Sequence, residues 1–314
     1  KGILDIPNSR SSHTVVMPRG GGVGLVITFL SGILIMTLLD VISLKLSLAI
    51  LIGGTIIAFV GWEDDRKGLP PKLRLLIHIV CSIWAVYIIG GIHSLNIGPI
   101  QISMPIYGSL LAVLAITWMI NLYNFMDGID GLAGVETVSV SIFACILLLF
   151  VGISDVGTIC LLLGSSCLGF LFWNWPPAKI FMGDVGSGFL GYIFAVLAFY
   201  LEFKGELSIL IWILLLGVFI VDATVTLIRR ILRQENLFEA HRSHAYQLLN
   251  RSGYNHKQII LSVIVINISL GILAFFALIM PDILLLIVVF TLAILVLLHF
   301  YIWHKYYLKL ERTS

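Results

Sequence analysis

Long apolar stretches alternate with short polar segments along almost the whole chain. We count ten apolar stretches, at roughly residues 23–39, 46–62, 75–92, 109–122, 135–152, 156–173, 188–203, 207–228, 259–280 and 283–303. A helix of about 20 residues crosses a hydrocarbon core of ~30 Å, and the sequence lacks the alternation typical of barrel strands. The pattern therefore predicts an all-α, polytopic integral membrane protein with ten transmembrane helices in a single domain over residues 1–314.

The polar segments are unevenly distributed between the two ends of these helices. Segments rich in carboxylates, asparagines or histidines follow every second apolar stretch, at Glu63–Asp65, Asn121–Gly131, Phe181–Gly188 and Glu239–Gln247. Because consecutive spans run in opposite directions, these four segments are expected to meet on one membrane face. Ionisable groups gathered at one interface favour chemistry there over conduction of a solute through the bilayer centre.

Composition and charge narrow the class of protein further. Hydrophobic residues make up 59% of the chain and charged residues 11%, which is not typical of a soluble protein. The net charge of +2 is too small to indicate a nucleic-acid partner. Of the 19 Lys and Arg residues, only Lys45 and Lys204 fall on the side away from the four segments. The positive-inside rule therefore predicts that the four segments face the cytoplasm.

Asn121, Asn124, Asp127 and Asp130 are spaced by three residues each time. On a helix that continued from the fourth apolar stretch, this spacing would bring them close to one face. Asparagine and aspartate oxygens are hard ligands suited to Mg²⁺, which commonly takes one or two protein ligands together with water and substrate phosphate. The alternative interpretation is a polar helix terminus with aspartate caps.

Two further acidic segments lie on the same predicted face. Asp184 is flanked by glycines in Met-Gly-Asp-Val-Gly-Ser-Gly, which would let the backbone turn closely around an ion or a phosphate. Asp64 and Asp65 are adjacent, and neighbouring acids can raise one pKa enough for one of them to act as a base. An ordinary solvated loop is the alternative for the Asp64–Asp65 pair.

Basic residues suggest where an anion would bind. His241, Arg242 and His244 supply three nitrogen-bearing side chains within four residues, a pattern suited to a diphosphate. A zinc site and an ordinary basic loop are the alternatives. Arg19 precedes three glycines and could also hold an anionic group, although basic residues beside a first span can serve topology alone. Within the spans, His78 and Asp222 are the isolated polar groups.

Five segments, in this order, resemble the polyprenyl-phosphate N-acetylhexosamine-1-phosphate transferases, a family that includes the phospho-MurNAc-pentapeptide translocases. They are DIPNSRSSHTVVMPRGGG from Asp5, WEDDRKGLPPKLRLLIH from Trp62, NLYNFMDGIDGLAG from Asn121, KIFMGDVGSGFLGY from Lys179 and HRSHAYQLL from His241. The resemblance extends over nearly the whole chain. It implies an eleven-helix membrane enzyme, so one family helix is expected to precede the ten found here.

The resemblance also implies a reaction. Undecaprenyl phosphate attacks the β-phosphate of a UDP-N-acetylhexosamine and yields the lipid diphosphate sugar and UMP, in the presence of Mg²⁺, for which Mn²⁺ is a candidate substitute. The implied site residues are the metal ligands Asn124 and Asp184, the catalytic acids Asp64, Asp65 and Asp127, and the substrate-binding residues Arg19, Asn121, Asp130, His241, Arg242 and His244.

The last loop separates this chain from one branch of the family. It reads His-Arg-Ser-His, whereas the peptidoglycan branch carries consecutive histidines there, so the O-antigen and polysaccharide-initiating branch is favoured. The expected partners are undecaprenyl phosphate, a UDP-N-acetylhexosamine and the bilayer of a bacterial inner membrane, and a homodimer is a further expectation. Two alternatives stay open: phospho-MurNAc-pentapeptide translocase activity, and a transporter or flippase of phosphorylated solutes.

Overall fold

The computed structural model describes residues 4–5, 16–236 and 241–307. Residues 6–15 of the first family-like segment, and residues 239–240 of the fourth polar segment, lie outside the described residues. The described elements are β1 (Leu4–Asp5), β2 (Met17–Pro18), α1 (Gly22–Leu38), α2 (Leu44–Leu48), η1 (Ala49–Gly53), α3 (Gly54–Lys67), α4 (Pro71–Ile89), β3 (Ser94–Ile97), β4 (Ile100–Ser103), α5 (Tyr107–Met126), α6 (Leu132–Phe150), α7 (Ser154–Asn174), α8 (Asp184–Lys204), α9 (Ile209–Leu215), α10 (Gly217–Leu232), α11 (Ala245–Arg251), α12 (His256–Ile279), η2 (Pro281–Ile283), α13 (Leu284–Ile302) and η3 (Trp303–Tyr307). Long apolar helices dominate, as the sequence predicts.

The number of complete spans is smaller than the ten expected. Among the described residues, eight helices are long and apolar enough to cross a membrane, and a ninth span is a bent pair of helices. The first expected span is the 17-residue helix α1. At 1.5 Å per residue, α1 is about 26 Å long, slightly shorter than a ~30 Å hydrocarbon core. The multi-pass membrane architecture is confirmed, and the exact count of ten is not.

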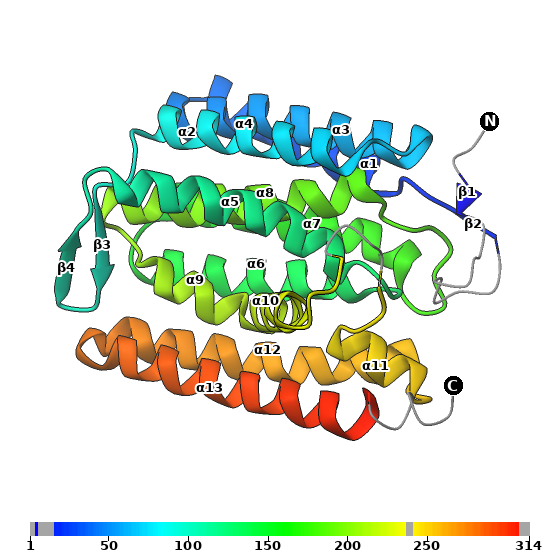
Figure 1. The fold of residues 1–314 in the computed structure, drawn as a ribbon. Helices are drawn as coiled ribbons and strands as arrows, with labels where there is room; N and C mark the ends of the chain where they lie inside the picture. The colour runs from blue at the N-terminus through cyan, green and yellow to red at the C-terminus, as the bar shows by residue number, and fades with distance from the viewer. Residues whose placement is uncertain (1–3, 6–15, 237–240, 308–314) are drawn as a thin grey trace.

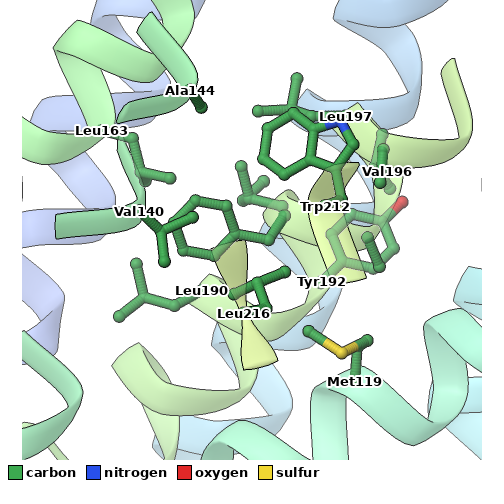
Figure 2. Close-up of a cluster of buried hydrophobic side chains, with 14 of the residues drawn as sticks. Met119, Val140, Ala144, Leu163, Leu190, Tyr192, Val196, Leu197, Trp212 and Leu216 are labelled. Carbon is green, nitrogen blue, oxygen red and sulfur yellow. The ribbon is translucent and has the colours of Figure 1, made fainter. Parts of the chain in front are cut away.

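Helix α8 forms the centre of the bundle, and 94% of its 18-residue apolar stretch is buried inside the protein. From Val185 to Leu201 its residues are apolar, aromatic or small on every side, as expected for a helix without a solvent or lipid face. Figure 2 shows part of the packing: Trp212 of α9 lies near Tyr192 and Val196 of α8, with Val140 of α6 and Met119 of α5 in the same cluster.

The eighth predicted stretch, expected as one span over residues 207–228, is broken. Helices α9 and α10 meet at an angle of 84°, and α10 is seen nearly end-on in Figure 1. The break falls at Leu216, just before Gly217. A Cβ on Gly217 would lie 3.1 Å from Leu295 and 3.3 Å from Leu270, so the glycine lets α10 start close against α13 and α12. The apolar residues along the chain predict the position of a span but not a bend within it.

The two ends of the bundle differ in character. At one end, β3 and β4 pair as an antiparallel hairpin between α4 and α5. At the other end lie α11, the described ends of the chain and the polar connections between helices (Figure 1). The functional chemistry expected from the sequence therefore falls at the end opposite the hairpin.

Candidate active site

Three of the predicted carboxylates come together where α3 ends and α8 begins. Asp64 and Asp65 lie in the last turn of α3, and Asp184 is the first residue of α8. The N–H groups of Asp184 and Val185 donate to the two carboxylate oxygens of Asp65, at 3.0 and 3.3 Å. This contact requires Gly61, because a Cβ there would lie 2.4 Å from the Asp184 carbonyl oxygen. The glycine thus allows the two helices to bring their acids side by side.

Two arginines bind these carboxylates. Arg19 reaches Asp65 from Nε at 2.8 Å and Asp184 from Nη2 at 2.6 Å. Arg74 of α4 donates from Nη1 to both Asp64 and Asp184, the latter at 3.0 Å. Three carboxylates and two guanidinium groups leave one negative charge in excess, so the cluster still favours a cation.

Arg19 reaches the cluster through the backbone of its segment. Arg19 forms a β-bridge with Phe181, the Phe181 N–H donates to the Pro18 carbonyl at 2.9 Å, and the Gly21 N–H donates to the Phe181 carbonyl at 2.9 Å. The segment before α1 therefore pairs with the loop before α8, which holds Asp184. Residues 165 positions apart become neighbours in this way.

A small cavity adjoins the cluster. It has a volume of about 40 Å³, and its lining includes Asp184, Arg74, Asn121 and Asn124. Asn124 donates to the Ser187 hydroxyl at 3.2 Å, whereas Asn121 donates to the Thr117 carbonyl of its own helix at 2.7 Å. One water needs a cavity of at least about 10–15 Å³, so this cavity can hold an ion and a few waters but not a nucleotide sugar.

The oxygen donors around this cavity fit a magnesium ion. Asp184 and Asn124 line the cavity and supply carboxylate and amide oxygens. Asp64 does not line it, but Nη1 of Arg74 contacts both Asp64 and Asp184, a place where a positive charge is favourable. In the described part of the chain, no group of three or more His, Cys, Asp or Glu side chains is arranged to hold a metal by itself. An ion would therefore depend on water and substrate phosphate for its remaining ligands, which is usual for Mg²⁺.

Asp127 and Asp130 do not continue the helical row that their spacing predicts. Helix α5 ends at Met126, Asp127 caps it, and the chain turns before α6 with Gly131 at φ 75°. The Gly131 N–H donates to Asn174 Oδ1 at 2.8 Å, which fixes the turn. The prediction of one helical face was wrong for these two acids, because α5 ends at Met126, before either acid is reached.

The two acids occupy different electrostatic environments. Burial raises the pKa of Asp127 well above its ordinary value, nearby Asp184, Asp65 and Asp130 raise it further, and Arg19 opposes them. Burial alone would also raise the pKa of Asp130, but hydrogen bonds from His256 and from the Ala178 N–H lower it below its ordinary value. The Asp130–His256 pair is 3.2 Å long. Asp127 is thus suited to carry a proton, and Asp130 is suited to accept hydrogen bonds.

The His-Arg loop before α11 is anchored by Asp222 of α10. The Asp222 carboxylate accepts from the Ala245 N–H at 3.0 Å and the Tyr246 N–H at 3.4 Å, and it lies 3.3 Å from His244 Nδ1. His244 also stacks on Tyr246, whose hydroxyl donates to the Phe125 carbonyl at 2.9 Å. Asp222 and Tyr246 therefore connect α10 to the last turn of α5, just before Asp127.

The other two residues of the predicted diphosphate group face elsewhere. His241 and Arg242 line a second hollow, which shares no described lining residue with the cavity at Asp184. His244 lies between the two regions, because its ring stacks on His241 and also lies near Phe125. The structure thus unites the acidic segments and places the His-Arg loop beside them rather than among them.

Several residues at or near the site were not singled out from the sequence. Arg74 carried a signal, since it is a basic residue in the first helical turn after Pro70-Pro71, ten positions beyond Asp64. His256 carried none, because it pairs with Asp130 across more than 120 positions of sequence. The sequence singled out His78 and Asp222 as polar residues within the spans, and the structure adds Glu136 of α6. Glu136 is fully buried and accepts a hydrogen bond from Asn267 of α12 at 2.7 Å.

Comparison with known proteins identifies the family. The sequence profile described as glycosyl transferase family 4 matches residues 47–202. The probable undecaprenyl-phosphate N-acetylglucosaminyl 1-phosphate transferase of Bacillus subtilis (strain 168) is 33% identical over 285 residues, which cover 87% of this chain and 76% of that protein. The undecaprenyl-phosphate alpha-N-acetylglucosaminyl 1-phosphate transferase of Salmonella typhi is 28% identical, with coverage of 87% and 75%. The decaprenyl-phosphate N-acetylglucosaminephosphotransferase of Mycobacterium leprae (strain TN) is 27% identical, with coverage of 86% and 74%. With the acidic segments gathered at one end of a helical membrane bundle, these similarities establish that the chain belongs to glycosyl transferase family 4, among the polyprenyl-phosphate N-acetylhexosamine-1-phosphate transferases.

Proposed function

We propose that this protein transfers an N-acetylhexosamine-1-phosphate group from a UDP-N-acetylhexosamine to undecaprenyl phosphate, yielding the lipid diphosphate sugar and UMP. The observation that carries the proposal is the cluster of Asp64, Asp65 and Asp184 with Arg19 and Arg74 at one end of a membrane bundle. The names of the relatives make N-acetylglucosamine the first sugar to test.

The chemistry requires two anions to approach each other. An oxygen of the lipid phosphate attacks the β-phosphorus, the bond from that phosphorus to the UMP oxygen breaks, and its electron pair leaves with UMP. A phosphate monoester is already largely ionised near neutral pH, so the attacking oxygen needs no general base. The protein's task is mainly to position the two phosphates and to neutralise their charge.

In this scheme the residues of the cluster have distinct tasks. Asp184, Asn124 and Asp64 would hold Mg²⁺, which when bound neutralises charge on the diphosphate. Arg19 and Arg74 lie beside these acids and can donate to phosphate oxygens. The cavity at Asp184 is too small for the nucleotide sugar, so the uridine and the sugar would lie outside it, towards Asp130 and the His-Arg loop.

The setting of the site is part of the proposal. We infer that the acidic end faces the cytoplasm, that the host membrane is a bacterial inner membrane, and that the protein initiates a surface polysaccharide; a homodimer is a further proposal.

The broken span α9–α10 is one feature that the transport alternative expects. The cluster of ionisable side chains lies at one end of the bundle, where a transferase site is expected, which favours the transferase over the transporter.

The test is an assay of purified protein in detergent with undecaprenyl phosphate, Mg²⁺ and a panel of UDP-sugars, followed by chromatography of the spent nucleotide. We expect UMP, and we expect Asp184→Asn and Asn124→Ala each to abolish its formation. Asp282→Asn, an exposed acid in η2 just before α13, is the matched control and should keep full activity. Release of UDP with a lipid monophosphate sugar would exclude phosphosugar transfer.

A further inference from the structure

Asp130, towards which the proposed function places the uridine, is bound by the protein through one carboxylate oxygen. It lies in the turn between α5 and α6, and its side chain is largely buried. Its Oδ2 lies 3.2 Å from Nδ1 of His256, the first residue of α12, and accepts from the Ala178 N–H at 3.0 Å. The start of α12 and the α7–α8 connection therefore bind the same oxygen atom.

The other carboxylate oxygen of Asp130 has no such partner. In the part of the chain that the structure describes, Oδ1 accepts no hydrogen bond from another residue. A carboxylate oxygen has two lone pairs, so Oδ2 is fully used by its two donors whereas Oδ1 can still accept. Burial raises the pKa of Asp130, but the hydrogen bonds from His256 and Ala178 lower it below its ordinary value. Oδ1 therefore belongs to an ionised group near neutral pH.

The backbone around Asp130 is fixed by a different residue. Asn174, at the end of α7, accepts the Gly131 N–H through Oδ1 at 2.8 Å and donates from Nδ2 to the Ile180 carbonyl at 2.9 Å. These bonds hold the turn, but they do not set the rotation of the Asp130 side chain. That rotation is constrained by the two donors to Oδ2, and only the imidazole of His256 can be removed by a side-chain substitution.

His256 is held in place by the cap of its helix. The Asn255 side chain accepts the Gln258 N–H at 2.9 Å, and Gln258 Oε1 accepts the Asn255 N–H at 3.0 Å. This reciprocal capping box satisfies two N–H groups at the start of α12 and fixes the path of the chain there. A side chain on a fixed helix end is well suited to orient another group.

Helix α12 is in turn fixed against α6. Ile260 lies so close to the turn before α6 that a Cβ on Gly131 would lie 3.1 Å from its Cδ1. Further along, Asn267 donates to the buried Glu136 of α6 at 2.7 Å. A buried hydrogen bond to a carboxyl group opposes sliding of one helix along the other, because sliding would leave polar atoms unpaired. The position of the imidazole beside Asp130 is therefore set by helix packing.

We propose that His256 is a positioning residue for nucleotide binding: it holds Oδ2 of Asp130, so that Oδ1 is left to accept a hydrogen bond from the uridine of the UDP-sugar. The inference rests on the proposed function, because it assigns the donor to a uridine nucleotide. Uridine has three donors, the uracil N3–H and the ribose 2′- and 3′-hydroxyls, and any of them would form a charge-assisted hydrogen bond with Oδ1. His256 acts through Asp130 and does not itself touch the substrate.

The first test measures binding of UMP to the full purified protein in detergent, which requires no turnover. His256→Ala should weaken UMP binding about tenfold, the order expected for loss of one hydrogen bond to a charged group. His256→Asn should restore most of the binding, because its Nδ2 branches from Cγ as the imidazole Nδ1 does. In the transfer assay, His256→Ala should raise the Michaelis constant for the UDP-sugar and leave kcat nearly unchanged.

His93→Ala is the matched control. His93 is an exposed histidine at the hairpin end of the bundle, and its Nδ1 also hydrogen-bonds, to the Pro105 carbonyl at 3.1 Å. This variant should bind UMP as the unchanged protein does. Adding His256→Ala to Asp130→Ala should cause no further loss of UMP binding, since His256 acts through that carboxylate.

The second test uses the unchanged protein, so it is informative even if His256→Ala does not fold. The 3-methyl, 2′-deoxy and 3′-deoxy analogues of UMP each lack one donor. One of them should bind about tenfold more weakly than UMP, which identifies the group that Oδ1 accepts. This penalty should shrink in His256→Ala, where Asp130 is no longer held.

Equal binding of UMP and all three analogues would overturn the proposal, as would unchanged UMP affinity in His256→Ala. Failure of His256→Asn to restore binding would assign His256 a role in folding alone and would also overturn it. If the unchanged protein forms UMP from the UDP-sugar while these effects are absent, the proposed function stands and the role of His256 falls. A protein that neither forms nor binds UMP would refute both.

Discussion

Asp127 shows how a single residue can acquire chemistry from its surroundings. The chain turns out of α5 at this position, which brings the carboxyl near Asp184, Asp65 and Asp130. Burial and these acids raise its pKa, so the folded protein holds a proton there that the unfolded chain releases. Stability contributed by this proton is fully present below the ordinary pKa of about 3.8 and declines as pH rises towards the raised value.

The first prediction at this scale is a pH effect of Asp127→Asn. An asparagine resembles the protonated acid but does not titrate, so the variant should gain thermal stability relative to the unchanged protein as pH rises from 5 to 8. Thermal unfolding in detergent with EDTA measures this without metal binding, and Asp282→Asn serves as the control. Parallel pH profiles for Asp127→Asn and the unchanged protein would contradict the raised pKa.

The second prediction concerns Arg74, which contacts both Asp64 and Asp184. Arg74→Gln should lower turnover about 100-fold, since a charge-assisted hydrogen bond contributes about 1.5–3 kcal/mol. Lys72→Gln removes an exposed charge two positions earlier in the same helix and should leave turnover unchanged. Full turnover by Arg74→Gln at low UDP-sugar would remove this arginine from the site.

At the scale of elements, the connection from α10 to α11 depends on one buried acid. Asp222 receives two backbone N–H groups at the start of α11 as well as the Thr226 hydroxyl, at 3.3 Å. It joins the broken span to the His-Arg loop, and Tyr246 then joins that loop to α5. The bend at Leu216 is therefore linked to the site through hydrogen bonds rather than through apolar packing alone.

We predict that Asp222→Asn loosens this connection without disturbing the acidic cluster. The two N–H groups bind different carboxylate oxygens, and asparagine replaces one of these oxygens with an NH2 donor. One N–H group therefore loses its acceptor, and hydrogen exchange at Ala245 or Tyr246 should accelerate. The Michaelis constant for the UDP-sugar should rise about tenfold, the effect of roughly 1.4 kcal/mol. Thr226→Val, which removes only the hydroxyl donor, is the comparison; unchanged exchange in Asp222→Asn would argue against the anchoring role.

At the scale of the whole molecule, the polar end and the hairpin end can be distinguished chemically. Cys81, Cys145, Cys160 and Cys167 are all buried, so an introduced cysteine can be labelled selectively. If the acidic end faces the cytoplasm, Gln101→Cys in the hairpin should react with a membrane-impermeant maleimide in intact spheroplasts. Lys72→Cys should react only after permeabilisation. The reverse pattern would invert the proposed orientation.

The sequence by itself determined the membrane class, the approximate positions of the helices and the gathering of acids at one end. These features depend on local composition and on the alternation of apolar and polar segments, which a linear reading measures directly. The motifs also located Asp64, Asp65 and Asp184 correctly as neighbours, because each follows a span of the same direction.

Only the tertiary structure decided how those residues are partnered. The pairing of Arg19 with Asp184 depends on a bridge between segments 165 positions apart, and the Asp130–His256 pair depends on the approach of α12 to the turn before α6. The break at Leu216 lies where α10 packs closely against α12 and α13 at Gly217, and the entry into α6 uses a positive φ at Gly131. Such contacts arise from the three-dimensional fit of distant surfaces, which periodicity along one chain does not encode.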